Sequence, residues 1–548
     1  MTNKEIAKVF QYLGQIMELH GENPYKVRSY QNAYLTLRKL DKPLSEMTGE
    51  EIGAIKGVGK AISSKIRELL DSGRLQSLEK YEDQTPEGVR ELLRIPGIGP
   101  KKIRTVWKDL GVESVGELLY AVQENRLLEL KGFGEKTQAD LKKKLEYYLR
   151  SKDRFRFASL DRPGQALLRQ LEEVGIEVAE TGPYRRRCNV LPAIELLVQA
   201  DQADKLRRSG LLQQIEAQND HWEAETTGEW PVRIHFAEPE DWGNRLLALT
   251  GDEAFVQALN QWNPNGPAKT EEALFKRAGL PPVPPELREG DWALEKAGDG
   301  QLPVLIEEQD IRGVLHAHST YSDGYHSLEE MARYCREQGY EYLGITDHSQ
   351  AAFYANGLKP ERVREQWAEI DRLNDDLTPF RIFKGIESDI LSDGSLDYAE
   401  DLLAGFDFII ASVHSNLRME EAKATQRLLR AIEHPHTRIL GHPTGRLLLS
   451  RPGYPIDHQA VIDACAEHRV AIELNANPYR LDLDWSWIPY ATEKGVRIAI
   501  NPDAHSREGI HDIRYGLLSA RKGGLTAEQC LNAMDLKAFE QWINSHQF

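Results

Sequence analysis

Short apolar runs recur between stretches of helical periodicity from Ile311 to the end of the chain. They fall at residues 313–315, 342–345, 381–383, 408–410, 439–440, 470–472 and 496–500. Runs that are apolar on both faces and alternate with helices are typical of a parallel sheet, and about 240 residues suit one α/β barrel. We therefore expect residues 311–548 to form such a barrel.

The first 150 residues have helical periodicity throughout and repeat one motif three times. Each copy leads from an apolar residue into Gly-apolar-Gly and an amphipathic helix, at residues 55–60, 95–100 and 130–135. Paired glycines permit a tight turn, and the N–H groups that begin the next helix can approach a phosphate. A helix-capping loop is the alternative for a single copy, but three in series favour a clamp on a nucleic-acid backbone.

The region between these two alternates strands with helices. Strand-like runs at 194–198 and 232–236 are separated by helical stretches. This pattern predicts a mixed α+β domain over residues 151–290, and we assign residues 291–310 to a linker.

Charge is unevenly distributed along the chain. The net charge is −17, but residues 1–150 carry 26 Lys/Arg against 22 Asp/Glu and are therefore +4, whereas the remainder is −21. A DNA-binding surface is therefore expected at the amino end. The sequence has no apolar window of membrane length and no signal-peptide pattern, and its four cysteines lie far apart, so we expect a cytoplasmic protein without disulfides.

Potential metal ligands follow almost every apolar run of the carboxy-terminal half, which holds 13 of the 16 histidines. The carboxyl ends of parallel barrel strands share one edge, and alternation places both side chains of His316-x-His318 and of Asp503-x-His505 on one face. Scattered solvent-facing histidines are the alternative. Nine ligands exceed the coordination sphere of one ion and suit two or three ions of Mn²⁺, Zn²⁺ or Fe²⁺. The candidates are His316, His318, Asp323, His348, Glu387, His414, His442, Asp503 and His505.

The motifs of this half, HAHSTYSDG, TDHS, GIESDIL, SVHS, GHPTGR and NPDAHS, resemble those of the polymerase and histidinol phosphatase (PHP) domain. The resemblance implies a distorted (β/α)7 barrel with these nine residues as metal ligands and Glu387 as a bridging carboxylate. It gives Asp347 a role in catalysis, orienting its neighbour from behind the ligands. Arg446 or Arg480 would hold a substrate phosphate, with surface salt bridges as the alternative.

The amino-terminal region resembles that of family X DNA polymerases through NPYKVRSY and the hairpin GVGKAISSKI. Its repeated motif is similar to the helix-hairpin-helix, which in known families grips the DNA backbone without reading sequence. The resemblance also puts Lys65 where relatives with lyase activity have a Schiff-base lysine; a phosphate contact is the alternative. The residues that would bind DNA are Gly57, Gly59, Lys60, Gly97, Gly99, Lys101, Gly132, Gly134 and Lys136.

The middle region resembles the family X palm and thumb, a nucleotidyltransferase-like fold, but departs from it where chemistry would occur. The two aspartate positions of the palm signature hold Ala193 and Glu195, and the third carboxylate position holds His235. Nucleotidyl transfer needs two metal ions held by carboxylates, so we predict that polymerase activity is lost. Weak residual synthesis is the alternative.

The complete architecture resembles bacterial family X polymerases. It implies a DNA-repair protein that binds DNA and hydrolyses phosphodiesters at DNA ends, as a metal-dependent 3′–5′ exonuclease, and we expect it to be monomeric. Two other hypotheses remain at this point: a phosphatase of small phosphate esters, similar to histidinol phosphatase, and a DNA-binding scaffold whose metals are structural.

Overall fold

The computed structural model describes residues 1–40, 42–95, 97–128, 130–150, 154–262, 264 and 266–545, apart from the side chains of Tyr147 and Arg150. It divides into two compact units, Met1–Ser151 and Lys152–Phe548. The predicted domain boundary at residues 150/151 adjoins residues 151–153, which lie outside the described residues. Within the described chain, no helix combines the length and the apolarity that a membrane span requires.

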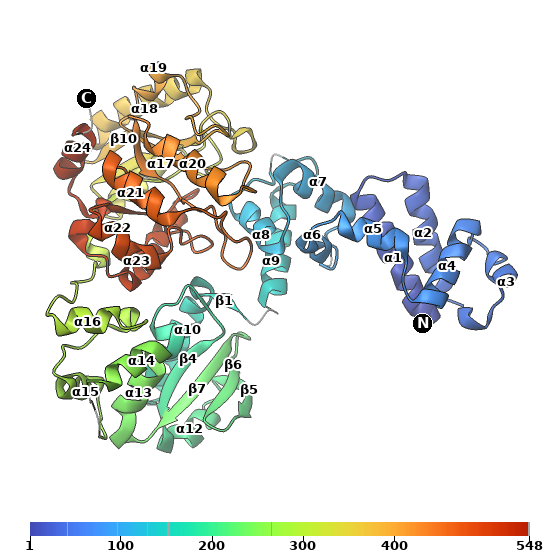
Figure 1. Ribbon diagram of the computed structural model, residues 1–548, viewed down its shortest axis with the longest axis horizontal. Coiled ribbons are helices and arrows are strands. Elements are labelled where there is room, and N and C mark those ends of the chain that lie inside the picture. Colours follow the sequence, from blue (N-terminus) through green and yellow to red (C-terminus); the bar gives the residue numbers. More distant parts are fainter. Residues whose placement is uncertain are drawn as a thin grey trace. The chain divides into compact units, whose positions relative to one another are not determined.

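The first unit is helical, as predicted (Figure 1). Its first helix begins at a capping box formed by Thr2 and Glu5 and buries Phe10, whose ring stacks on Tyr30 of the second helix at 5.9 Å. The helices are α1 (Asn3–Leu19), α2 (Pro24–Leu37), α3 (Gly49–Gly53), α4 (Lys60–Ser72), α5 (Gln76–Asp83), α6 (Glu87–Leu92), α7 (Pro100–Leu110), α8 (Val115–Gln123) and α9 (Glu135–Arg150).

The second unit begins with the palm-like region, which we define as residues 154–310. Its main sheet has the order β2-β4-β7-β6-β5, and only the β4–β7 pair is parallel. Leu196 and Val198 of β4 pack with the α10 side chains, while Leu197 between them packs with α13. The elements are β1 (Phe155–Arg156), α10 (Phe157–Glu173), β2 (Val178–Glu180), α11 (Gly182–Arg185), β3 (Val190–Leu191), β4 (Ile194–Gln199), α12 (Ala203–Arg208), β5 (Leu212–Ala217), β6 (His221–Thr226), β7 (Pro231–Ala237), α13 (Trp242–Thr250), α14 (Glu253–Asn260), α15 (Glu271–Ala278) and α16 (Trp292–Gly298).

The segment that the sequence assigns to a linker, residues 291–310, is structured. Ala293, Leu294 and Ala297 of α16 are buried among side chains of α14 and α15. Their spacing of three and four residues makes one apolar helix face, which is a helical signal in a short segment. The chain then reaches the barrel, where Ile306 is buried and its N–H donates to Leu525 O.

Seven parallel strands in sequential order form the barrel, residues 311–545, as the sequence pattern predicts. The strands are β8 (Gly313–Val314), β9 (Tyr342–Ile345), β10 (Arg381–Asp389), β11 (Phe408–Ser412), β12 (Thr437–Leu440), β13 (Ala471–Asn475) and β14 (Ile498–Asn501). The helices are α17 (Leu328–Glu337), α18 (Pro360–Leu377), α19 (Glu400–Leu403), α20 (Glu421–Ile432), α21 (His458–His468), α22 (Ile488–Glu493), α23 (Ile513–Lys522) and α24 (Leu536–Asn544).

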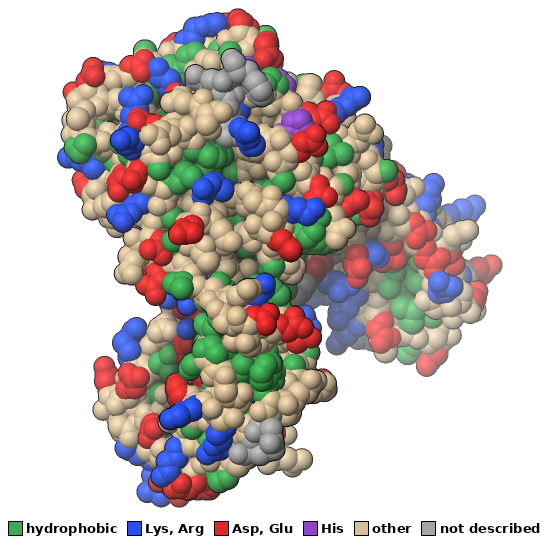
Figure 2. All heavy atoms as spheres, turned by 60° about the vertical axis from the view of Figure 1, so that its left-hand side comes forward, with side chains coloured by type: hydrophobic (Ala, Val, Ile, Leu, Met, Phe, Trp, Pro, Cys, Tyr) green, Lys and Arg blue, Asp and Glu red, His purple; other side chains and the backbone are tan. Residues whose placement is uncertain are grey.

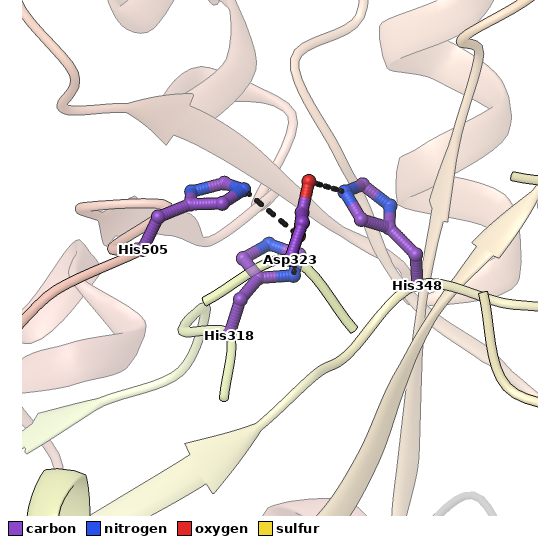
Figure 3. Close-up of side chains that lie close together, drawn as sticks. All are labelled: His318, Asp323, His348 and His505. Atoms are coloured by element: carbon purple, nitrogen blue, oxygen red, sulfur yellow. Dashed lines mark ion pairs between the residues drawn. The ribbon is translucent and has the colours of Figure 1, made fainter. Parts of the chain in front are cut away.

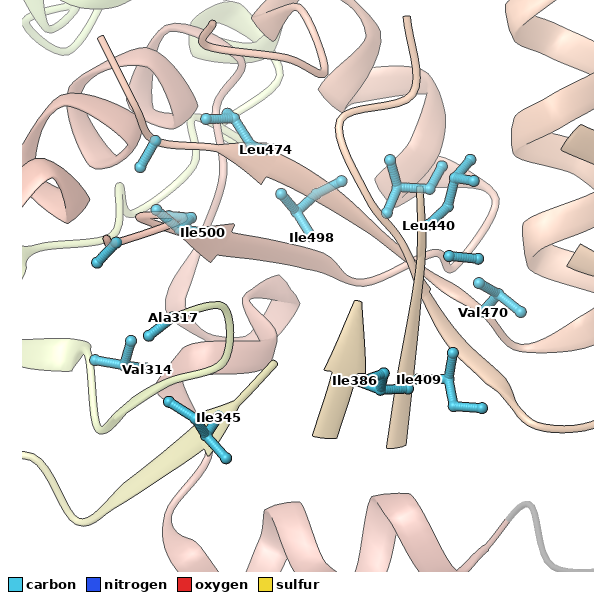
Figure 4. Packing of buried hydrophobic residues seen from close by; sticks show 14 of the residues in the cluster. Val314, Ala317, Ile345, Ile386, Ile409, Leu440, Val470, Leu474, Ile498 and Ile500 are labelled. Atoms are coloured by element: carbon cyan, nitrogen blue, oxygen red, sulfur yellow. The ribbon is translucent and has the colours of Figure 1, made fainter. Parts of the chain in front are cut away.

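Two apolar layers hold the barrel together. One lies between strands and helices and includes Ile345, Ile409 and Ile498 (Figure 4). The other fills the interior near the amino ends of the strands, where Phe383 and Phe408 meet Phe539 of α24, with ring centroids 5.0 and 6.2 Å from that of Phe539. Apolar side chains therefore fill the barrel interior at the amino ends of the strands, and the carboxyl edge is left for the functional site.

The first and last strands are joined by few direct bonds. Beyond their ends, Ala317 pairs with Ala504, and the N–H of His318 donates to Ala504 O at 2.8 Å. The buried Asn532 side chain bridges the strands themselves, because it accepts from the N–H of Ile500 and donates to Gly313 O. Asn532 thus supplies hydrogen bonds that a closed ladder would otherwise make.

Candidate metal centre

Because side chains alternate between the two faces of a strand, the polar residues of the cluster share a face with apolar residues of the barrel interior. Strand β10 turns Phe383, Gly385, Glu387 and Asp389 toward one side; Phe383 belongs to the interior apolar cluster and Glu387 lies among the histidines. Because side chains alternate with a period of two, the same strand face supplies apolar packing at its start and carboxylates at its end. Strand β13 repeats the arrangement, with Ala471 in the interior cluster followed by Glu473 and Asn475.

The ligand candidates meet at the carboxyl edge of the barrel. Around Asp323, nitrogen atoms of three histidines approach its carboxylate: His505 Nε2 at 3.3 Å, His348 Nε2 at 3.7 Å and His318 Nδ1 at 3.9 Å (Figure 3). The described residues contain further groups of the barrel whose ligand atoms lie within 4.8 Å of one another: His316 with His318, Glu387 and Asp503, and His348 with Glu387 and His414.

Glu387 lies at the centre of the cluster. Its carboxylate is fully buried and lies close to ring nitrogens from five histidines. The distances are 2.9 Å to His348 Nδ1, 3.0 Å to His442 Nε2, 3.1 Å to His414 Nε2, 3.5 Å to His316 Nε2 and 3.7 Å to His318 Nε2. The structure therefore brings all nine candidate ligands into one continuous cluster with Glu387 at its centre.

The donor set fits divalent ions. Within the described residues, buried ring nitrogens of His316, His318 and His348 and a buried oxygen of Glu387 make no hydrogen bond. Buried polar atoms normally make hydrogen bonds. Where a ring nitrogen and a carboxylate oxygen face each other with no proton between them, both need another partner. Imidazole and carboxylate are the ligands that Zn²⁺, Mn²⁺ and Fe²⁺ accept, and the three overlapping groups suit more than one ion.

The charges of the cluster shift its pKa values in opposite directions. Burial opposes protonation of His316, yet Glu473, Asp503 and Glu387 raise its pKa well above the ordinary value. Burial, together with the nearby His505 and His348, lowers the pKa of His318 to about 4. Without cations, the carboxylates can thus draw protons onto some histidines, which places positive charge in the site.

Burial and adjacent histidines compete at the carboxylates as well. Burial raises the pKa of Glu387, but His414, His316 and His348 lower it well below its usual range. The same opposition lowers the pKa of Asp503 through His316 and His318. These carboxylates therefore remain ionised in the pH range in which metal ions bind.

Two carboxylates behind the ligands were missed in the sequence analysis. Glu473 accepts from His316 Nδ1 at 2.7 Å, and Asp389 lies 2.5 Å from His414 Nδ1. A carboxylate on Nδ1 fixes the ring so that Nε2 faces Glu387. For Glu473 the available signal was a polar residue inside an apolar run, Ile472-Glu473-Leu474, whereas Asp389 stands beside Glu387 and Ser388 and has no such signal.

Asp347 supports the loop between two ligands rather than its neighbour His348. Its oxygens accept from the N–H and hydroxyl of both Ser319 and Ser322, and from Gln366 Nε2 at 2.6 Å. These bonds hold the segment that connects His318 to Asp323. Asp347 is therefore placed as a positioning residue.

The two candidate phosphate-binding arginines differ in their surroundings. Arg446 donates to Asp484 Oδ2 at 2.6 Å and to the carbonyls of Arg480 and Leu481, which corresponds to the salt-bridge alternative. Arg480 is buried, and its Nε lies 3.8 Å from Asp503 Oδ2. Of the two, Arg480 is therefore the arginine beside the cluster.

The three glycine hairpins of the first unit share one backbone geometry. The first glycines, Gly57, Gly97 and Gly132, have φ of +89°, +86° and +93°. This left-handed conformation explains why glycine stands there. The second glycines, Gly59 and Gly99, cap α4 and α7, and Gly134 directly precedes α9, so the N–H groups that begin each helix follow the turn. The hairpin lysines Lys60, Lys101 and Lys136 are exposed.

Lys65 lies within α4 and is partly buried. Its ammonium group donates to Ser77 Oγ at 2.8 Å. A serine hydroxyl is not a general base, so this contact adds no support for Schiff-base chemistry at Lys65.

The degenerate polymerase positions lie on β4 and β7 and, for Ala193, directly before β4. Ala193 is buried and offers no ligand, while Glu195 lies 3.4 Å from Arg233 NH1 and 3.7 Å from His235 Nε2. A cationic arginine occupies space beside the one remaining carboxylate. Among the described residues of the palm-like region, no set of three ligands converges as in the barrel.

Comparisons with known proteins agree with the division of the chain into a helix-hairpin-helix region and a carboxy-terminal barrel. Family models match a helix-hairpin-helix domain over residues 1–75, a SAM-like helix-hairpin-helix tandem over 89–146 and a PHP domain over 315–477. The chain is 35% identical over 570 residues to the DNA polymerase/3'-5' exonuclease PolX of Bacillus subtilis (strain 168), covering 99% of each chain. These matches confirm the resemblances found in the motifs.

The barrel alone is also similar to other proteins. A probable phosphatase of Thermoanaerobacter sp. (strain X514) is 29% identical over 235 residues, which cover 40% of this chain and 90% of the relative. A probable phosphatase of Acetivibrio thermocellus is 28% identical over 241 residues, which cover 42% and 93%. The barrel thus occurs with and without the regions that precede it here.

Proposed function

This chain belongs to the PolX family, and from that premise we propose that it binds DNA and hydrolyses phosphodiesters from 3′ ends as a metal-dependent exonuclease. We assign DNA binding to residues 1–150, a polymerase-shaped scaffold to 151–290 and hydrolysis to 311–548. The observation that carries the proposal is the convergence of nine imidazole and carboxylate groups with Glu387 at their centre, of which all but Asp323 and His414 are buried.

The nine proposed ligands would hold two or three divalent ions. Bound cations of this kind neutralise a phosphate and lower the pKa of a water molecule, so that hydroxide is available near neutral pH. Glu473 and Asp389 hold His316 and His414 in the required ring orientation. Arg480, next to Asp503, supplies a positive charge beside the position of the phosphate.

Loss of polymerase activity is part of the proposal. Besides the missing aspartates, the three consecutive arginines that follow the palm turn are engaged in internal ion pairs. Arg185 pairs with Glu271 at 2.7 Å, Arg186 with Glu289 at 3.2 Å and Arg187 with Glu180 at 2.5 Å. Side chains held in this way stabilise the scaffold and do not present a cationic surface to a triphosphate.

The test is a nuclease assay on the full chain loaded with Mn²⁺. A 5′-labelled single-stranded oligonucleotide should be shortened stepwise from its 3′ end, and Asp503→Asn should reduce the rate by at least two orders of magnitude, about the loss expected when a metal ligand is removed. Asp401→Asn, an exposed aspartate of α19, is the matched control and should retain full activity. An intact substrate in the presence of metal-loaded protein would reject the proposal.

Two further assays address the alternatives. The similarity of the barrel to probable phosphatases supports testing histidinol phosphate and other small phosphate esters. Rapid hydrolysis of those esters by a protein that leaves oligonucleotides intact would favour a phosphatase. Primer extension with Mg²⁺ or Mn²⁺ that disappears on Glu195→Gln would show that the palm-like region retains synthesis.

A further inference from the structure

Exposed hydrophobic side chains of the barrel gather on the loops that carry the ligands. Among its described residues, the large hydrophobic side chains that are exposed are Tyr325, Phe353 and Leu449. Each lies a few residues after a ligand candidate: Asp323, His348 and His442, respectively. Single exposed hydrophobic residues are common on protein surfaces, but here all three follow ligand candidates in the sequence, which points to a ligand at this edge of the barrel.

Phe353 is the most exposed of the three, at 82%. It lies in a short helical turn, Phe353–Ala355, of the loop that links His348 to α18. The ring gains no burial from this position, so it adds little to the stability of the fold.

The loop nevertheless holds a fixed shape. Its two ends are joined, because Ser349 pairs with Leu358, and the N–H of Ala351 donates to Asp397 Oδ2 at 2.6 Å. A side chain on Gly357 would collide with Ser349 O, which explains the glycine where the loop closes. A rigid loop that presents an aromatic ring to solvent is already organised for binding.

A row of rings connects Phe353 to the metal centre. The ring centroid of Tyr354 lies 6.4 Å from that of His348 and 5.9 Å from that of Phe353. The phosphate and the base of one nucleotide are separated only by a sugar. A nucleotide whose phosphate is held at His348 and its neighbours can therefore bring its base to these rings.

We propose that Phe353 is a base-stacking residue that binds an unpaired nucleobase at the end of a single-stranded substrate. This inference rests on the proposed function and adds the substrate class: an end whose bases are unstacked. Aromatic faces accept any base, so the site would bind single strands without sequence preference. Tyr325, 52% exposed, supplies a second ring through a segment whose N–H donates to His505 O.

The test removes the Phe353 ring by substitution and the terminal base of the substrate by use of an abasic nucleotide, each separately. Single-turnover cleavage is measured on two 5′-labelled single strands that differ only in the terminal nucleotide, which is either thymidine or its abasic analogue. On the normal strand, Phe353→Ala should lower kcat/KM about tenfold, and the abasic end should lower the wild-type value by a similar factor. On the abasic strand, the variant and the wild type should agree within about twofold, because the stacking partner is already gone.

Phe353→Trp is the matched variant and should retain the wild-type rate on the normal strand. Equal losses by Phe353→Ala on both strands, or no loss on either, would overturn the inference while leaving the nuclease intact. Binding provides a separate readout: 2-aminopurine at the 3′ end should be quenched by the wild type in Ca²⁺ and not by Phe353→Ala. A wild type that cleaves neither strand would instead reject the proposed function, and unchanged quenching by the variant would still reject the stacking role.

Discussion

Glu473 determines the orientation of several groups in the cluster at once. One oxygen accepts from the backbone N–H of His442 and from Asn475, and the other accepts from His316 Nδ1 and from Asn501. Four donors directed at two oxygens require a carboxylate, because the amide nitrogen of glutamine is a donor and would face two of them.

Glu473→Gln should therefore weaken metal binding by about 10- to 100-fold, the range found for residues that orient ligands. Metal content after dialysis and titration calorimetry with Mn²⁺ measure this without any assay of activity. Glu433→Gln changes an exposed glutamate of the same barrel and should bind metal like the wild type. An unchanged affinity in Glu473→Gln would show that His316 is held by its other contacts.

The nine ligand candidates could be identified from the sequence because each follows an apolar run, and strand ends of a parallel barrel share an edge. Glu473 and Asp389 could not be identified as partners of His316 and His414, since one sequence does not show which strands are neighbours. The partner of Arg446 could not be predicted from the sequence either. The resemblance to the PHP domain implied a phosphate contact for Arg446, but its guanidinium donates to Asp484, which is distant in the sequence.

At the scale of elements, closure of the barrel depends on a side chain. Asn532→Ala would leave the N–H of Ile500 and the carbonyl of Gly313 buried without their partners. Each unsatisfied buried group costs about 1–3 kcal/mol, so the free energy of unfolding should fall by about 3 kcal/mol. Urea unfolding followed by tryptophan fluorescence measures the change. Asn544→Ala, at the exposed end of α24, should leave stability unchanged.

The repeated strand and helix pattern predicted the seven strands, but this closure depends on one asparagine outside every strand. No periodicity marks Asn532, because its role comes from contacts with β8 and β14, far away in sequence. The spacing of the apolar residues of α16 is visible in the sequence, but the helices against which that face packs are not.

A buried ion pair joins the palm-like region to the barrel. Lys522 of α23 is 4% exposed, and its ammonium group lies 2.5 Å from Glu289, which also pairs with Arg186. Burial raises the pKa of Glu289, but Lys522 and Arg186 lower it below the ordinary value. This carboxylate therefore stabilises the fold above about pH 4.5, its ordinary value, and that stabilisation is lost as the pH falls through the lowered pKa.

Glu289→Gln should lower the free energy of unfolding by about 3 kcal/mol at pH 7, since it leaves the Lys522 charge buried without its partner. The difference between variant and wild type should shrink as the pH approaches 3, because the wild-type carboxyl then becomes neutral as well. Urea unfolding at a series of pH values measures it. Glu295→Gln, an exposed neighbour, is the control, and a difference that is constant with pH would contradict the assigned role of Glu289.

At the scale of the whole molecule, charge divides the chain into a basic first unit and an acidic second unit. Basic and acidic side chains are interspersed on the face shown in Figure 2, but the first unit has a net charge of +4 and the second unit a net charge of −21. A polyanion should therefore be held mainly by the hairpins of the first unit, where exposed lysines accompany the helix starts.

Replacement of Lys60, Lys101 and Lys136 by alanine should reduce the slope of log affinity against log salt by about 3, one for each lost phosphate contact. Fluorescence anisotropy with duplex DNA over a range of salt concentrations measures the slope. The control replaces Lys4, Lys8 and Lys39, which are exposed in the same unit but lie outside the hairpins, so that both variants lose the same charge. Because the hairpins act on the backbone, the loss should be similar for unrelated DNA sequences. Equal slopes for the two variants would show that net charge, rather than the hairpin geometry, binds the DNA.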